Sequence, residues 1–228
     1  MKKKDIILLI YILSIIFLFM IPGSRTWIEN QTISYPYIMG FIKTSILATS
    51  GELIASRIAT KDYFSKPGLH YRFIVWGFLG MGFVLMFEVY ASGVDGAIQA
   101  NLLPSFSQIG LIQKLYQAFV TSLIMNLTFA PAFMLLHRVT DTYLDLSMGK
   151  IKSIQKGLIA DTIDWKNYFQ FVLLKTIPFF WIPAHTITFL LPSQYRVLMA
   201  GFLSIALGLI LSLSKIYSKS SKKPSDVL

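Results

Sequence analysis

The residues of this chain best placed to do chemistry are polar and ionisable side chains set inside apolar segments. A charged group is costly in hydrocarbon, so each of these positions is by default a functional candidate. It can line a pore, or it can form a structural pair that fixes how helices align. The candidates are Lys43, Glu52, Glu88, Asn126, Lys175 and His185.

Catalytic chemistry has little support in the sequence. The three histidines, His70, His137 and His185, have no partner at metal-ligand spacing. No glycine-rich phosphate loop, GxSxG or HExxH occurs, and the chain has no cysteine. His137 and Asp141 share a helical face near a predicted membrane surface, where such a pair is usually a solvated cap. We therefore predict no catalytic residues, no metal and no cofactor, and a protein that is not an enzyme.

The composition predicts a membrane protein. Hydrophobic residues make up 54% of the chain and charged residues 14%, and the mean hydropathy is +0.61. A spanning helix needs about 20 apolar residues, and six segments qualify. They are Ile6–Pro22, Tyr37–Ile58, Arg72–Ser92, Leu115–His137, Tyr168–Leu191 and Tyr195–Tyr217. The expected fold is an all-α polytopic helical bundle of about six transmembrane helices. Alternatively, because Pro192 makes a tight turn, the last two segments form a hairpin that dips without crossing.

The positive charges predict that both termini are cytoplasmic. With that orientation, the only loop cations outside are Arg25, Lys114 and Arg196. The net charge of +10 then lines one membrane face. Anionic lipid headgroups are the expected partner there, and nucleic acid is not.

The chain divides into three parts on this interpretation. Residues 1–35 form an extra N-terminal transmembrane helix and an outer loop, residues 36–217 the main bundle, and residues 218–228 a basic disordered tail. Lys2–Lys4 before an apolar run resembles a signal peptide, but Ile21–Ser24 is a poor cleavage site, so we expect the span to be retained. Gly93–Gln113 is an outer connector. In the inner loop Arg138–Asn167, apolar residues at helical spacing predict either a short interfacial helix or an ordinary connecting one.

Small residues at every fourth position predict close helix packing. One stripe is Ala200, Ser204, Gly208 and Ser212 in the last span. Another is Gly40, Thr44, Ala48, Gly51, Ala55 and Ala59 in the second, and Gly77, Gly80 and Gly82 add to it from the third. Packing within one chain is the default, and a homo-oligomer is the alternative.

Depth along the spans predicts two polar pairs. Glu52 and Lys175 lie at similar depths, about 9–10 Å from the inner face at 1.5 Å per residue, and Lys43 and Glu88 match near the outer face. Alternatively, both lysines extend to their nearer interfaces and Glu52 is protonated or pairs with Arg57.

Several motifs resemble the Mpv-seventeen / peroxisomal membrane protein of twenty-two kilodaltons family. Trp181 and Pro183, then Phe189, then Pro192-x-x-Tyr195-Arg196 are similar to its carboxy-terminal signature. Gly51-Glu52 and Phe129-Ala130-Pro131 resemble two of its earlier motifs. Thr188 stands where the signature has asparagine, and the spacing from Phe189 to Pro192 is one residue shorter. As this family's Tyr-Arg counterpart, Arg196 either pairs with an outer carboxylate such as Glu88 or extends to the headgroups.

The resemblance implies a divergent bacterial member in the plasma membrane. A eukaryotic member would lie in the mitochondrial inner or peroxisomal membrane. It further implies a channel or pore that affects membrane permeability to small solutes. The alternative is a non-conducting scaffold or interaction protein.

Overall fold

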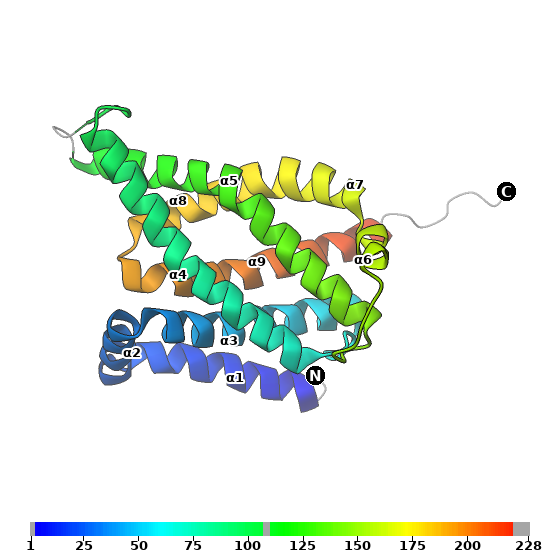
Figure 1. Ribbon diagram of the computed structural model, residues 1–228. Coiled ribbons are helices and arrows are strands. Elements are labelled where there is room, and N and C mark those ends of the chain that lie inside the picture. The colour runs from blue at the N-terminus through cyan, green and yellow to red at the C-terminus, as the bar shows by residue number, and fades with distance from the viewer. Residues whose placement is uncertain (1–2, 107–109, 221–228) are drawn as a thin grey trace.

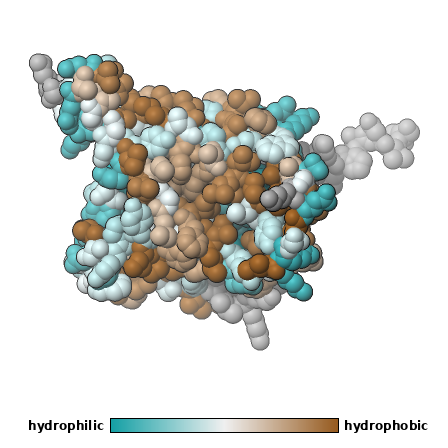
Figure 2. Space-filling view, viewed as in Figure 1, coloured by the Kyte–Doolittle hydropathy of each residue, from teal (hydrophilic) through white to brown (hydrophobic). Residues whose placement is uncertain are grey.

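The computed structural model describes residues 3–106 and 110–220. The side chains of residues 3–4, 7–9, 12, 16, 19, 156 and 211–220 lie outside that description. The described chain is helical throughout, with no strand. Five of its helical stretches are long and apolar enough to cross a membrane. The prediction of an all-α membrane bundle is therefore confirmed. Figure 2 shows apolar side chains over the middle of the visible face and hydrophilic ones toward its two ends.

The five stretches correspond to five of the predicted spans. They are α3 (Pro36–Thr60), α4 (Leu69–Gln99), α5 (Gly110–Leu146), the continuous stretch Trp165–Leu190, and Ser193–Ile210 within α9 (Ser193–Ser220). Helix α3 is central, since it packs along both α4 and α9, and α5 packs on α4 and on the stretch Trp165–Leu190. The α3–α4 turn, the end of α5 and the end of α9 share one end of the bundle (Figure 1). We call this the predicted cytoplasmic end.

The amino-terminal part agrees with the prediction only in its first half. Helix α1 (Lys3–Met20) occupies the first predicted span and also begins at the predicted cytoplasmic end (Figure 1). The expected outer loop is wrong, because residues 22–34 form helix α2 (Pro22–Ser34). Pro22 at its first turn has the fixed φ that favours helix initiation. Helix α1 is not among the five stretches that are long and apolar enough to cross a membrane, so a sixth span remains a prediction.

Two helices extend well beyond their apolar segments. Helix α4 continues to Gln99 and α5 covers 37 residues, so the outer connector is shorter than predicted. Hydropathy indicates where lipid ends, and a helix can continue into water beyond that point. The short helix expected in the inner loop is only α6 (Lys156–Thr162), with Ile151 and Ile154 outside it. At the carboxyl end, Ser218–Ser220 belong to α9 and are not disordered as predicted; the rest of that tail lies outside the described residues.

The stretch Trp165–Leu190 is not one regular helix. It comprises α7 (Trp165–Asn167), the wide π-helix η1 (Tyr168–Trp181) and α8 (Ile182–Leu190). Pro178 lies inside η1, where a regular α-helix would lose a hydrogen bond and meet the proline ring. π-Turns are often found at functional sites because they change which residues face inward.

Most glycines of the predicted small-residue stripes pack within the chain; Gly82 does not, since a Cβ there would meet nothing within 4 Å, and the Ser212 side chain lies outside the described part. A Cβ built on Gly80 of α4 would lie 2.5 Å from the Gly40 carbonyl oxygen of α3. A Cβ on Gly51 would lie 3.1 Å from the Ile205 Cα of α9, and Gly208 faces Ala55. Close backbone approach of this kind stabilises helix pairs in lipid.

Candidate functional site

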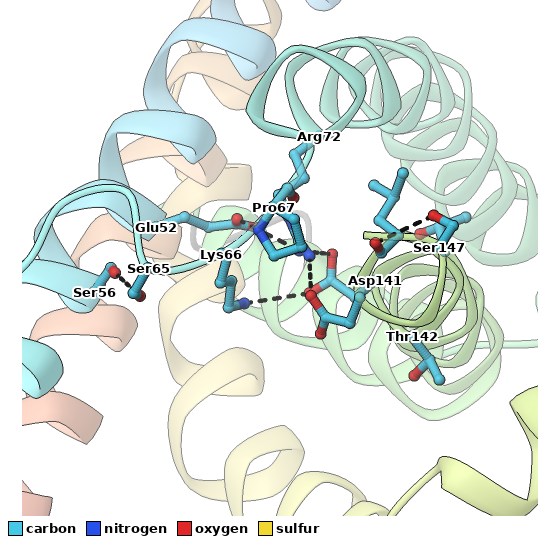
Figure 3. Close-up of polar contacts among 12 residues, drawn as sticks. Glu52, Ser56, Ser65, Lys66, Pro67, Arg72, Asp141, Thr142 and Ser147 are labelled. Atoms are coloured by element: carbon cyan, nitrogen blue, oxygen red, sulfur yellow. Dashed lines mark hydrogen bonds and ion pairs between the residues drawn. The ribbon is translucent and has the colours of Figure 1, made fainter. Parts of the chain in front are cut away.

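A buried arginine organises the predicted cytoplasmic end. Arg72, in the first turn of α4, is 1% exposed. Its two terminal nitrogens donate to Asp141 Oδ1 and Asp145 Oδ1, each at 2.6 Å, and its Nε donates to the Pro67 carbonyl at 3.1 Å. These charge-assisted bonds join α4 to the end of α5 and to the loop before α4 (Figure 3).

Glu52 faces this cluster from α3. Its Oε1 accepts a hydrogen bond of 2.8 Å from the Trp76 indole nitrogen, and its Oε2 lies 3.9 Å from the Arg72 guanidinium. His137 Nε2 lies 3.5 Å from the same Oε1 and has no hydrogen-bond partner. The predicted pair with Lys175 is wrong. The depth of a residue along its helix does not determine the direction of its side chain, and the side chain of Glu52 points toward α4.

Three ligand atoms of this cluster are close enough to suggest a cation site. Those of Glu52, His137 and Asp141 lie within 4.8 Å of one another. Asp141, however, already accepts a bond from Arg72 and lies 3.5 Å from Lys66 Nζ (Figure 3). Two cations therefore occupy the place that a metal would need, and the arrangement fits an ion-pair cluster better than a metal centre.

A cavity of about 1200 Å³ runs from this end into the bundle. It lies between α3 and α9 on one side and α5 and η1 on the other. Exposed polar residues surround its mouth, among them Ser65, Lys66, Lys166 and Asn167. Its inner end is near the middle of α5, where Asn126 lies.

A hydrogen-bond network connects α5 to α8 at this inner end. Ser122 Oγ donates to the Ile182 carbonyl at 2.7 Å, and Asn126 Nδ2 donates to the Ser122 carbonyl at 2.8 Å. Asn126 Oδ1 lies 3.1 Å from His185 Nδ1. Ser122 and Asn126 are fully buried and His185 is 5% exposed. Two of the predicted polar candidates are thus in direct contact.

Aromatic side chains close the cavity beyond that network. Phe87 and Phe189 have ring centroids 5.4 Å apart and belong to one buried cluster with Phe83 and Met125. Phe83 and Met125 line the cavity, whereas Phe87 and Phe189 do not.

The remaining polar candidates lie apart from one another. Lys43 is buried and donates to Thr32 Oγ1 at 2.6 Å, which ties α2 to α3. Glu88 is exposed and accepts from Ser92, so the predicted pair of Lys43 and Glu88 is wrong. Lys175 lines the cavity and has no hydrogen-bonded or ionic partner among the described residues.

Most residues of the family-like motifs serve packing and turns. Arg196 lies over the Phe189 ring and donates to the Leu191 carbonyl. It attracts Glu88 electrostatically without a direct ion pair between these two described residues, and its extension to headgroups stays a prediction. Tyr195 hydrogen-bonds to Glu29 of α2. The others have the following places: Gly51 at the α3–α9 contact, Pro131 with its carbonyl bonded to Tyr168, Trp181 on the cavity wall, Pro183 in the first turn of α8, and Pro192 at the turn into α9.

The sequence analysis missed the role of Arg72 and its partners. Arg72 is predicted only as the first residue of the span Arg72–Ser92, and Asp145 is not among the predicted polar candidates. Helical spacing contained a signal, since Arg72 and Trp76 are four apart, as are His137, Asp141 and Asp145. Each set forms one face at the same predicted end of the bundle.

Comparisons of the chain with protein-family models, with curated proteins and with solved structures gave no match. Functional inference therefore depends on the geometry of the site itself.

Proposed function

We propose that this membrane protein provides a gated route for small polar solutes, and that the cavity is its vestibule. The cavity is the observation that carries the proposal. It is large enough for a small molecule and reaches the middle of the bundle. Intramembrane polar groups along its wall, Glu52, Asn126, Lys175 and His185, favour a solute pathway.

The aromatic cluster is the proposed gate. Phe87 and Phe189 lie between the inner end of the cavity and the opposite face, and hydrophobic constrictions close pores by excluding water. Opening would require α8 to move relative to α4. The wide turns of η1, directly before α8, are a suitable place for that movement.

Solute uptake by reconstituted vesicles tests the proposal. Stopped-flow light scattering should show faster entry of glycerol or urea than into protein-free vesicles, and Phe87→Ala should increase the rate further. Phe78→Ala is the matched control, because this α4 phenylalanine is 64% exposed and outside the gate. Rates equal to those of empty vesicles for the parent and for Phe87→Ala would contradict the proposal.

A non-conducting scaffold is the second candidate, and the Arg72 cluster favours it. There, charges within the bundle are satisfied by one another, as expected when they fix helix alignment. The absence of uptake in the same experiment would support this alternative.

The motif resemblance extends the proposal to membership of the Mpv-seventeen family and to a bacterial plasma membrane. The basic residues would then contact anionic headgroups on the cytoplasmic side.

A further inference from the structure

We infer that the inner end of the cavity binds a small neutral solute whose polar head both donates and accepts a hydrogen bond. A primary amide and an undissociated carboxylic acid have such a head. The inference deepens the proposed function and rests on it for the route by which the solute arrives. The binding site itself stands on the contacts of Asn126, Trp181 and His185.

The network fixes the proton of His185. Asn126 Nδ2 donates to the carbonyl of Ser122, so Oδ1 is the amide atom that faces His185. An amide oxygen only accepts, and therefore His185 Nδ1 must carry the proton. His185 is 5% exposed and has no carboxylate in contact, which makes a charged imidazole unfavourable. Nε2 of the neutral ring is then a free acceptor.

Trp181 supplies a donor beside this acceptor. Its ring stacks on that of His185, with centroids 5.1 Å apart and planes 22° apart. Both rings line the cavity, and Trp181 is 9% exposed. Neither Trp181 Nε1 nor His185 Nε2 has a hydrogen-bond partner among the described residues. Buried polar atoms in native proteins are nearly always paired, so two unpaired ones on stacked rings that line the cavity indicate where a ligand belongs.

The two atoms define the head group that fits. Trp181 Nε1–H can only donate, and His185 Nε2, once Nδ1 is protonated, can only accept. An amide or carboxylic acid group can satisfy both at once, with its carbonyl toward Trp181 and its N–H or O–H toward His185. A carboxylate could not, because it has no hydrogen to give to Nε2.

The cavity wall beside this pair selects against charge and favours a short apolar tail. It includes Ala130, Met134 and Leu207, which belong to the apolar cluster of Trp181. The edge of Phe87 contacts the His185 ring, at 5.6 Å between centroids. None of these side chains compensates a charge, so a charged head would lose its hydration without replacement.

Indole resonances of the full chain in lipid nanodiscs test the inference without transport. Labelling with ¹⁵N-tryptophan gives one indole signal for each of the four tryptophans, and Trp181→Phe identifies that of Trp181. Propionamide should shift the Trp181 signal. N,N-dimethylpropionamide has no hydrogen to give to His185 Nε2, so it should need about fivefold higher concentration to shift the signal. Propionate at neutral pH has a charge and should not shift it. Propionic acid at low pH, where it is undissociated, shows whether a carboxylic acid binds as the amide does.

One variant and its control measure how much the His185 acceptor contributes to propionamide binding. His185→Phe should weaken propionamide binding about fivefold, the effect of losing one hydrogen bond, while His70→Phe, at an exposed position, should not change it. If His185→Phe does not fold, the comparison of the three probes in the parent still decides. Equal shifts with all three probes, or no shift, would overturn the inference. A specific shift without solute uptake in vesicles would support the binding site and contradict the proposed function. Uptake without a shift would support the proposed function and contradict the binding site.

Discussion

The indole nitrogen of Trp76 lies 2.8 Å from Oε1 of Glu52. This bond crosses from α4 to α3 directly beside Arg72, and the Trp76 ring also contacts that of His137 of α5, with centroids 4.3 Å apart and planes tilted by 41°. One tryptophan therefore connects three helices at the edge of the cavity. The carboxylate of Glu52 is held toward α4 by this donor, whatever solute the cavity contains.

A double-mutant cycle tests that relationship. Glu52→Gln and Trp76→Phe should be coupled by about 1.5 kcal/mol, because hydrogen bonds to charged groups are stronger than neutral ones. Glu52→Gln and Lys175→Met should instead be additive to within about 0.5 kcal/mol. Denaturant unfolding in detergent measures both cycles. Coupling to Lys175 but not to Trp76 would refute the arrangement.

Among the charged residues, substitution of Arg72 should lower the stability of the protein most. Arg72→Met removes the partner of two carboxylates, and breaking a buried ion pair costs about 3–5 kcal/mol. Arg72→Lys should recover only part of this, since a lysine cannot reproduce the guanidinium fork. Thermal unfolding in detergent is the measurement. Lys114→Met, at an exposed site of α5, is the control, and an equal effect of both methionine variants would be evidence against the cluster.

The α3–α4 contact should not tolerate a methyl group at Gly80. A Cβ there would lie 2.5 Å from the Gly40 carbonyl oxygen, so Gly80→Ala must separate the helices and should lower the melting temperature. Gly82→Ala, in the same helix, meets nothing within 4 Å. It should be neutral or stabilising by up to about 1 kcal/mol, the difference in helix propensity. The opposite ranking would show that the two helices do not approach as described.

Thiol labelling tests the orientation in the membrane. A cysteine at Ser105, in the α4–α5 loop, should react with an impermeant maleimide in intact cells, because the loop cations lie mostly on the other side. One at Ser153, between α5 and α6, should react only after the membrane is broken. The chain has no cysteine of its own, so the background is clean. Labelling of Ser153→Cys in sealed cells would show that the predicted orientation is wrong.

The sequence by itself determined the all-helical class, the place of five spanning helices and the small-residue contacts between them. It could do so because each depends on local composition: apolar length decides what can enter lipid, and glycine decides where backbones can approach. Gly80 and Gly51 are therefore where their spacing predicts. Helix ends such as Gln99 and Leu146 were not predicted, because a helix can continue beyond the apolar part of its sequence.

Only the tertiary structure decided which polar groups meet. Glu52 and Lys175 match in depth, yet Glu52 turns to Trp76 and Arg72, because the direction of a side chain depends on how its helix is rotated against its neighbours. In the same way, Asn126 and His185 are 59 residues apart and become partners only when α5 packs on α8. Trp181 and His185, by contrast, are four residues apart in one helical stretch, so helical spacing alone brings their rings together. Composition and spacing along one chain do not contain that rotation, and therefore neither the cavity nor the contact of Asn126 with His185 could be predicted from them.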